Sequence, residues 1–307
     1  MKHTHKKEER RGAVICGAYG RGNAGDDAIL RAIMQEMRQL DETMPMRVIS
    51  RNPTETSRRF GVSACHTFHF KEVWQAVGKA ELFVSGGGSL IQNATSSRSL
   101  YYYLMTLLMA KLRGCKVMMY GSGIGPVYGK FHRWAAGKII DRCVDVATLR
   151  DEDSRRELGY MGVKNPKMLC TADPTISIHQ LDQEQGNKLL EYLGIPADGE
   201  YLGLGLRQWK GFDEAVENIA EALEYAYKTY GLIPVFVPIE YPNDCQAAKK
   251  VIDKLNCPYY LISEQLEISE TVSVLAHMKA MIGMRLHSLI FAVENGVPSI
   301  GVSYDMK

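Results

Sequence analysis

The sequence has no apolar run long enough to cross a membrane, and no arrangement of cysteines that suits a metal or a disulfide framework. Its longest mostly apolar stretch, residues 100–112, is interrupted by Lys111 and is shorter than the roughly 20 residues that a membrane-spanning helix needs. The seven cysteines are odd in number and include no CxxC pair, which favours buried, reduced thiols. We therefore expect a cytoplasmic protein.

Excess charge of one sign is also missing. Lys and Arg number 37 against 35 Asp and Glu, a formal net charge of +2, so the sequence predicts no nucleic-acid partner. The basic residues 1–11 (MKHTHKKEERR) precede no apolar segment and are predicted to form a mobile arm, weakly attracted to an anionic surface at the inner face of the cytoplasmic membrane.

What the sequence does have is the composition of a folded globular protein and room for two domains. Apolar residues make up 46% and charged residues 23% of its 307 residues, a length that suits two cores of about 150 residues each. The oligomeric state stays open, and a homo-oligomer is compatible with the sequence.

Short apolar runs alternate with helical patterns from residue 12 onward, as in βαβ units of a parallel sheet. The predicted strands are 13–17, 47–50, 81–85, 116–120, 144–148 and 168–171, then 201–206, 233–238, 259–262, 280–283 and 298–302. The predicted helices are 27–40, 97–113, 130–142 and 151–161, then 182–193, 212–230, 245–255, 268–277 and 285–295.

This order predicts an α/β fold with parallel sheets and two Rossmann-like lobes that face each other across a cleft. The N-terminal domain is expected at 12–175 and the C-terminal domain at 176–307. The chain stops a few residues after a predicted strand, so we expect a closing C-terminal segment to be missing.

Three glycine-rich segments follow predicted strands of the first domain, at 17–27, 86–89 and 121–126. Glycine allows the backbone to approach a ligand closely, although tight turns also use it. The first segment contains the adjacent carboxylates Asp26 and Asp27, either of which could simply cap a helix. The occurrence of three glycine-rich segments at strand ends of one sheet nevertheless indicates a surface where the backbone contacts a substrate.

Basic side chains follow strands of the second domain. Arg207 ends one strand, and Arg285 and His287 lie where another strand meets an apolar helix, whose N-terminus attracts anions. Arg285 could clamp an anion with its guanidinium fork or form a structural ion pair, and His287 could be a core histidine. In the first domain, Arg150 could bind a ligand or pair with neighbouring acids.

Cys65, His66 and His69 have side chains of the types that bind metal ions. They lie in a strand-like run with aromatic residues and lack a fourth ligand, so the sequence predicts no metal site.

Seven segments in order resemble the motifs of polysaccharide pyruvyl transferases, in particular those of the CsaB type. They are GNAGDDA (22–28), GGGSLIQ (86–92), YGSGIGP (120–126), LRD (149–151), ADP (172–174), MRLH (284–287) and YDMK (304–307). The resemblance covers the chain from about residue 12 to its end.

The resemblance implies a two-lobed, GT-B-like enzyme that uses phosphoenolpyruvate as co-substrate and no cofactor. It implies transfer of the enolpyruvyl-derived group to N-acetylmannosamine in a lipid-linked precursor of secondary cell wall polysaccharide, giving a 4,6-linked pyruvate ketal and phosphate. The product would anchor proteins of the S-layer.

The resemblance also assigns site residues. Donor binding is expected at Arg207, Arg285, Leu286, His287 and Lys307, and acceptor binding at Asn23, Gly25, Gly87, Gly88, Ser89, Ser122 and Arg150. His287 is the expected proton donor, and Asp26 or Asp27, placed on the other lobe, the expected base.

Two other functions fit the same pattern. One is a nucleotide-sugar glycosyltransferase of the same fold, with Arg285 on the diphosphate and Glu294 near a ribose. The other is a non-catalytic protein that binds wall glycan.

Overall fold

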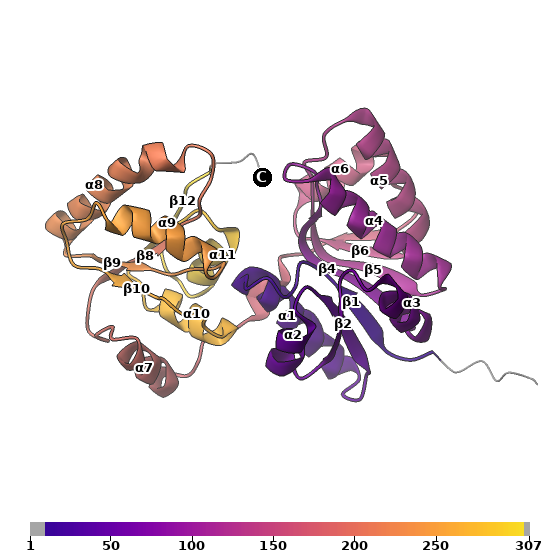
Figure 1. Ribbon diagram of the computed structural model, residues 1–307, viewed down its shortest axis with the longest axis horizontal. Helices are drawn as coiled ribbons and strands as arrows, with labels where there is room; N and C mark the ends of the chain where they lie inside the picture. The colour runs from indigo at the N-terminus through magenta and orange to yellow at the C-terminus, as the bar shows by residue number, and fades with distance from the viewer. Residues whose placement is uncertain (1–9, 304–307) are drawn as a thin grey trace, which may run out of the picture. The chain divides into compact units, whose positions relative to one another are not determined.

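The computed structural model describes residues 10–303, which form two compact units (Figure 1). The predicted arm, except for Arg10 and Arg11, and the predicted site residue Lys307 lie outside the described residues. The second unit starts at Thr175 and also contains the distant segment Gly22–Ala28. The sequence prediction placed that segment in the first domain.

The first unit is built on a seven-stranded parallel sheet in the order β3-β2-β1-β4-β5-β6-β7. Its strands are β1 (Ala13–Cys16), β2 (Met46–Ser50), β3 (Ser63–His66), β4 (Leu82–Ile91), β5 (Lys116–Ile124), β6 (Val146–Leu149) and β7 (Lys167–Cys170). The helices between them are α1 (Ala24–Leu40), α2 (Pro53–Phe60), α3 (Phe70–Lys79), α4 (Ser97–Leu112), α5 (Lys130–Cys143) and α6 (Glu152–Tyr160).

Both faces of this sheet are covered, because neighbouring residues of each strand point to opposite sides. Val14 packs into a core that also contains side chains of α3, α4 and α5, whereas Ile15 packs into a core with side chains of α1. Helices therefore cover both faces of the sheet, as its continuously apolar strands predict.

The structure corrects the prediction in two parts of this unit. The elements α2 and α3 were not predicted, and β3 was indicated only by the strand-like run that contains Cys65 and His66. In addition, residues 86–89 and 121–124 of the predicted glycine-rich segments are strand residues, because β4 continues to Ile91 and β5 to Ile124. Gly88 pairs with Ser122, and the register between the two strands is irregular after this pair.

The second unit repeats the design with a five-stranded parallel sheet in the order β10-β9-β8-β11-β12. Its strands are β8 (Tyr201–Gly205), β9 (Ile233–Phe236), β10 (Tyr260–Leu261), β11 (Ala280–Gly283) and β12 (Ser299–Gly301). After the short 3-10 helix η1 (Pro174–Ser177), its helices are α7 (Gln183–Tyr192), α8 (Phe212–Tyr230), α9 (Asn243–Ile252), α10 (Ile268–Ala276) and α11 (Leu286–Glu294). The predicted α/β class with parallel sheets and two Rossmann-like units is confirmed.

Between residues 10 and 303, no helix combines the length and the apolar character needed to span a bilayer.

Candidate active site

The carboxyl edge of the second sheet brings the predicted donor residues together. β8 and β11 are neighbours, and the chain leaves them in opposite directions, toward β9 and toward β12. Such a reversal opens a crevice beyond the strand ends, where Rossmann-like sheets bind ligands. Arg207 follows β8, while Arg285 and His287 follow β11, so all three lie at this switch point.

Arg285 forms a buried ion pair in the structure. Its Nε and Nη2 donate to the two carboxylate oxygens of Asp244 at 3.1 and 2.6 Å, and Nη2 also donates to Glu240 at 2.6 Å. Its side chain is only 10% exposed, and that of Asp244 only 3%. Of the two interpretations of Arg285, the structural ion pair is the observed one, so its guanidinium is not an open anion clamp.

Glu240 links this ion pair to Arg207. Burial opposes ionisation of the Glu240 carboxyl, but the charges of Arg285 and Arg207 and hydrogen bonds from Arg285 and Asn243 outweigh it and hold the pKa below its ordinary value. Asp244 in turn accepts the backbone N–H groups of Ile239 and Glu240 at 3.1 and 2.8 Å. The loop after β9 is therefore tied to the start of α11.

The segment Gly22–Ala28 is also tied to this loop by its backbone. Ala24 N–H donates to the carbonyl of Ile239 at 2.7 Å, and Tyr241 N–H donates to the carbonyl of Gly22 at 2.9 Å. Asn23 forms an antiparallel bridge with Glu240. The first turn of α1 consequently belongs to the edge that carries Arg207 and Arg285.

His287 packs directly against this first turn. A Cβ atom on Gly25 would lie 2.0 Å from Nδ1 of His287, so only glycine fits beside the imidazole. His287 itself lies in the first turn of α11. Two helix N-termini, those of α1 and α11, therefore meet at this histidine, and both attract negative charge.

Asp26 and Asp27 follow Gly25 in the same turn. Neither is the simple helix cap considered above, because the side chain of Asn23 accepts the N–H groups of Gly25 and Asp26 at 2.9 and 3.3 Å. Asp27 is buried and Asp26 half-buried. They lie in the same unit as His287, which corrects the prediction that placed them on the other lobe.

A second cluster of predicted residues forms in the first unit around Arg150. Its Nη2 donates to Ser89 Oγ at 2.9 Å, and its guanidinium pairs with Asp173 at 3.6 Å and Asp151 at 3.4 Å. Arg150 thus does pair with acids, as its alternative interpretation stated, but it also orients the hydroxyl of Ser89. The Ser122 side chain is buried beside this cluster, and its carbonyl accepts the Arg150 N–H at 3.3 Å.

Gly87 and Gly88 lie in β4 with positive φ values of 49° and 68°. A Cβ atom on Gly87 would lie 2.3 Å from Cγ2 of Ile29, so packing of the strand on α1 accounts for this glycine. Asn23 and Gly25, which were predicted with these residues as acceptor groups, instead lie with Glu240 and His287.

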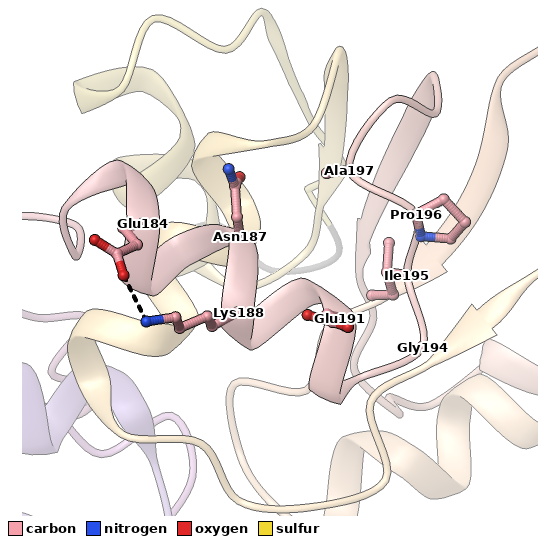
Figure 2. A pocket seen from close by; sticks show the side chains of 8 residues that line it. All are labelled: Glu184, Asn187, Lys188, Glu191, Gly194, Ile195, Pro196 and Ala197. Atoms are coloured by element: carbon pink, nitrogen blue, oxygen red, sulfur yellow. Dashed lines mark hydrogen bonds and ion pairs between the residues drawn. The ribbon is translucent and has the colours of Figure 1, made fainter.

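A pocket of the second unit lies elsewhere, between α7 and the loop that leads into β8 (Figure 2). It has a volume of about 540 Å³, and Figure 2 shows the Glu184–Lys188 ion pair, with an O–N distance of 2.6 Å, along its α7 wall. Because this loop enters β8 at its amino end, the pocket is at the opposite end of the strand from Arg207. It contains no predicted site residue.

Glu240 and Asp244, the acids that pair with Arg285, were not predicted as site residues. A usable signal was available, because both follow β9, the neighbour of β8, and so were bound to reach the same sheet edge as Arg207. Among residues 10–303 no group of three or more His, Cys, Asp or Glu is arranged to hold a metal ion.

Comparison with known families shows to which family the chain belongs. The sequence model of one family, described as polysaccharide pyruvyl transferase, matches residues 23–306. The chain belongs to the polysaccharide pyruvyl transferase family. It is also 19% identical over 351 residues to the amylovoran biosynthesis protein AmsJ of Erwinia amylovora, covering 96% of this chain and 83% of that protein.

Solved structures support the fold. The chain is similar to the UDP-GlcNAc 2-epimerase of Neisseria meningitidis, with a TM-score of 0.65, 14% identity and coverage of 95% of this chain and 83% of that one. The epimerase of Methanocaldococcus jannaschii gives a TM-score of 0.64 and 14% identity, with coverage of 94% and 82%. Membership of the pyruvyl transferase family makes the chain a transferase acting in polysaccharide synthesis.

Proposed function

We propose that the chain transfers the enolpyruvyl-derived group of phosphoenolpyruvate to two hydroxyl groups of one sugar residue, with release of phosphate. The proposed acceptor is N-acetylmannosamine in a lipid-linked precursor of secondary cell wall polysaccharide, and the ketal joins O4 and O6. Family membership supports the reaction type.

The observation that carries the proposal is the meeting of the α1 and α11 N-termini at His287. Phosphoenolpyruvate has a carboxylate and a phosphate on one small carbon frame, and the positive dipole end at a helix N-terminus favours such anions. The first N–H groups of α1 already donate to Ile239 and Asn23, so α1 contributes through its dipole. Arg207, at the end of β8, supplies a cation at the same edge, and Leu286 opens α11 there. The guanidinium of Arg285 already has carboxylate partners, so we assign it to fixing the loop that precedes His287.

The reaction requires proton transfers in sequence. A proton adds to C3 of the donor, the oxygen of a first hydroxyl bonds to C2, and that hydroxyl loses its proton. The C2–O bond to phosphate then breaks with its electron pair on oxygen, and a second hydroxyl oxygen bonds to C2 and loses its proton. Of the two hydroxyl protons released, one balances the proton added to C3 and the other ends on the phosphate. In the proposed mechanism, His287 donates a proton toward the departing phosphate, and Asp26 or Asp27 accepts a hydroxyl proton.

The acceptor is proposed to bind at the carboxyl edge of the first sheet. Ser89 and Arg150 offer a hydroxyl and N–H donors, and the glycine backbone of β4 provides room for close approach. Hydrogen bonding of this kind suits the hydroxyl and amide groups of an amino sugar.

Acceptor-dependent release of inorganic phosphate from phosphoenolpyruvate tests the proposal. Synthetic N-acetylmannosamine and galactose glycosides are compared as acceptors, with wild type, His287→Asn and the control His277→Asn, which changes a half-buried histidine at the end of α10. We expect His287→Asn to lower kcat by about 100-fold or more. Unchanged turnover and donor Michaelis constant in His287→Asn would refute the assignment.

A nucleotide-sugar transferase is the second candidate, because structural neighbours bind such compounds. HepE of Anabaena, described in complex with UDP-glucose, has a TM-score of 0.59 and 11% identity to this chain. Offering labelled UDP-GlcNAc with the same acceptors separates the two functions, since release of UDP without use of phosphoenolpyruvate would favour this candidate. A non-catalytic glycan-binding protein would release neither product.

A further inference from the structure

An apolar surface with three aromatic rings lies on α5 and the loop before it. Tyr128, Phe131 and Trp134 are 54%, 66% and 59% exposed, and the ring centroids of Phe131 and Trp134 are 5.8 Å apart. On α4, Met105 and Leu112 are 54% and 70% exposed. The two helices pack side by side (Figure 1), so these side chains form one surface, here called the α4–α5 face. Such an exposed apolar patch marks an interaction site.

The backbone beneath the rings is held in place. Asn93 receives a hydrogen bond from the N–H of Tyr128 at 2.6 Å and donates one to its carbonyl at 3.0 Å. Arg133 pairs with Glu157 and donates to the carbonyl of Val127 at 3.3 Å. Exposure of the aromatic rings is therefore a property of an anchored segment and not of a frayed one.

The charge of the α4–α5 face is positive. Arg98, Lys130, Lys138 and Arg142 are exposed and form no ion pair within the described residues 10–303. The single acid on the two helices, Asp141, accepts the N–H groups of residues 164 and 165 at 2.6 and 2.9 Å.

The spacing of residues along α5 places two of these cations next to the aromatic rings. Positions 131, 134, 138 and 142 fall on one side of α5, so Phe131 and Trp134 continue directly into Lys138 and Arg142. Aromatic and aliphatic side chains next to unpaired Lys and Arg are typical of segments that lie in the boundary between lipid headgroups and acyl chains.

We propose that the α4–α5 face docks on the surface of an anionic lipid bilayer, with Phe131 and Trp134 entering the headgroup boundary and the four cations contacting lipid phosphates. A symmetric contact between two copies would set these cations against each other, whereas an anionic lipid surface complements them. The inference goes beyond the proposed transfer reaction and holds whichever donor the active site uses.

Co-sedimentation of the full chain with vesicles tests the proposal. Vesicles of phosphatidylcholine alone are compared with vesicles containing about a third phosphatidylglycerol, for wild type, Phe131→Ser/Trp134→Ser and Lys130→Gln/Lys138→Gln. The matched control is Tyr225→Ser/Tyr230→Ser, which removes two rings of α8 that are 60% and 64% exposed. Melting temperatures verify that each variant is folded.

We expect wild type to prefer the anionic vesicles, and each of the two α5 double variants to lower the partition coefficient about tenfold or more, while the control does not. Brominated lipid should quench Trp134 fluorescence, and the conservative Trp134→Phe should keep binding while losing that quenching. Phosphate release with a short, lipid-free acceptor should be the same in all variants. Failure of this membrane test therefore differs from failure of the proposed transfer reaction.

Three results would overturn the proposal. The first is absence of wild-type binding to anionic vesicles, and the second is binding that survives Phe131→Ser/Trp134→Ser. The third is loss of an oligomer or of affinity for an acidic polysaccharide in that variant, without loss of vesicle binding, which would assign the face to a second copy or to glycan.

Discussion

Replacing Asp244 with asparagine removes one negative charge from the buried cluster around Arg285 while it keeps the shape of the side chain. The two partners are 3% and 10% exposed, so water cannot restore the lost charge balance. Breaking a buried pair from one side costs about 3–5 kcal/mol, and since Glu240 remains 2.6 Å from Nη2 we expect the lower end, about 3 kcal/mol. For a domain of about 150–250 residues, a loss of that size lowers the melting temperature by about 6–12 °C.

Urea unfolding followed by circular dichroism measures this change. Asp253→Asn is the matched control, since it makes the same substitution at the exposed C-terminal end of α9, the helix that carries Asp244. Combining Asp244→Asn with Glu240→Gln should give a non-additive loss, with a coupling of at least about 0.5 kcal/mol. A loss below about 1 kcal/mol for Asp244→Asn would refute the argument that Arg285 depends on this carboxylate.

Three further outcomes follow from the described contacts. Gly25→Ala, whose new Cβ would lie 2.0 Å from His287 Nδ1, should lower kcat for phosphate release about 100-fold, whereas Gly186→Ala in the open interior of α7 should leave kcat unchanged. The pKa of Glu240 is held below its ordinary value of 4.5, so its contribution to stability is present above that pH and is lost as the pH falls through the lower, folded-state pKa. Thermal melts of Glu240→Gln should therefore depend less on pH than those of wild type between about pH 5 and 3, and equal slopes would contradict this. Arg150→Lys loses the guanidinium fork and should raise the acceptor Michaelis constant about tenfold with little change for the donor; an equal rise for both would argue against an acceptor role.

Much of the fold follows from periodicity in the sequence. The strands and helices from β8 onward begin and end within a few residues of their predicted positions, because Gly and Pro separate short apolar runs there. The region between β2 and β4 was missed because α2 is an eight-residue helix of mostly polar residues and β3 has only four residues. The signals for α2 were local, namely the Asn52 cap, Pro53 in the first turn and a left-handed Gly61 at the end.

The extension of β4 and β5 could not be predicted from propensity. Glycine is a poor strand former, yet Gly86 pairs with Tyr120 and Gly88 with Ser122, since strand pairing outweighs the local preference.

The partners of Arg285 were also not predicted from the sequence. An acid in the first turn of a helix, such as Asp244, is accounted for by the helix dipole alone. Only its place after β9, at the sheet edge that it shares with Arg285, indicates a cation partner 41 residues away.

The position of Gly22–Ala28 has a practical consequence for dividing this chain. A fragment beginning at Thr175 would lack the turn that hydrogen-bonds Ile239 and covers His287, although it would contain the whole five-stranded sheet. We expect such a fragment to expose the imidazole and the edge beside β9 to solvent and to aggregate or bind anions poorly when expressed alone. Joining residues 22–28 to Thr175 through a short linker should prevent this aggregation and restore anion binding. A fragment for recombinant expression of the second unit should therefore combine two segments that are far apart in the sequence.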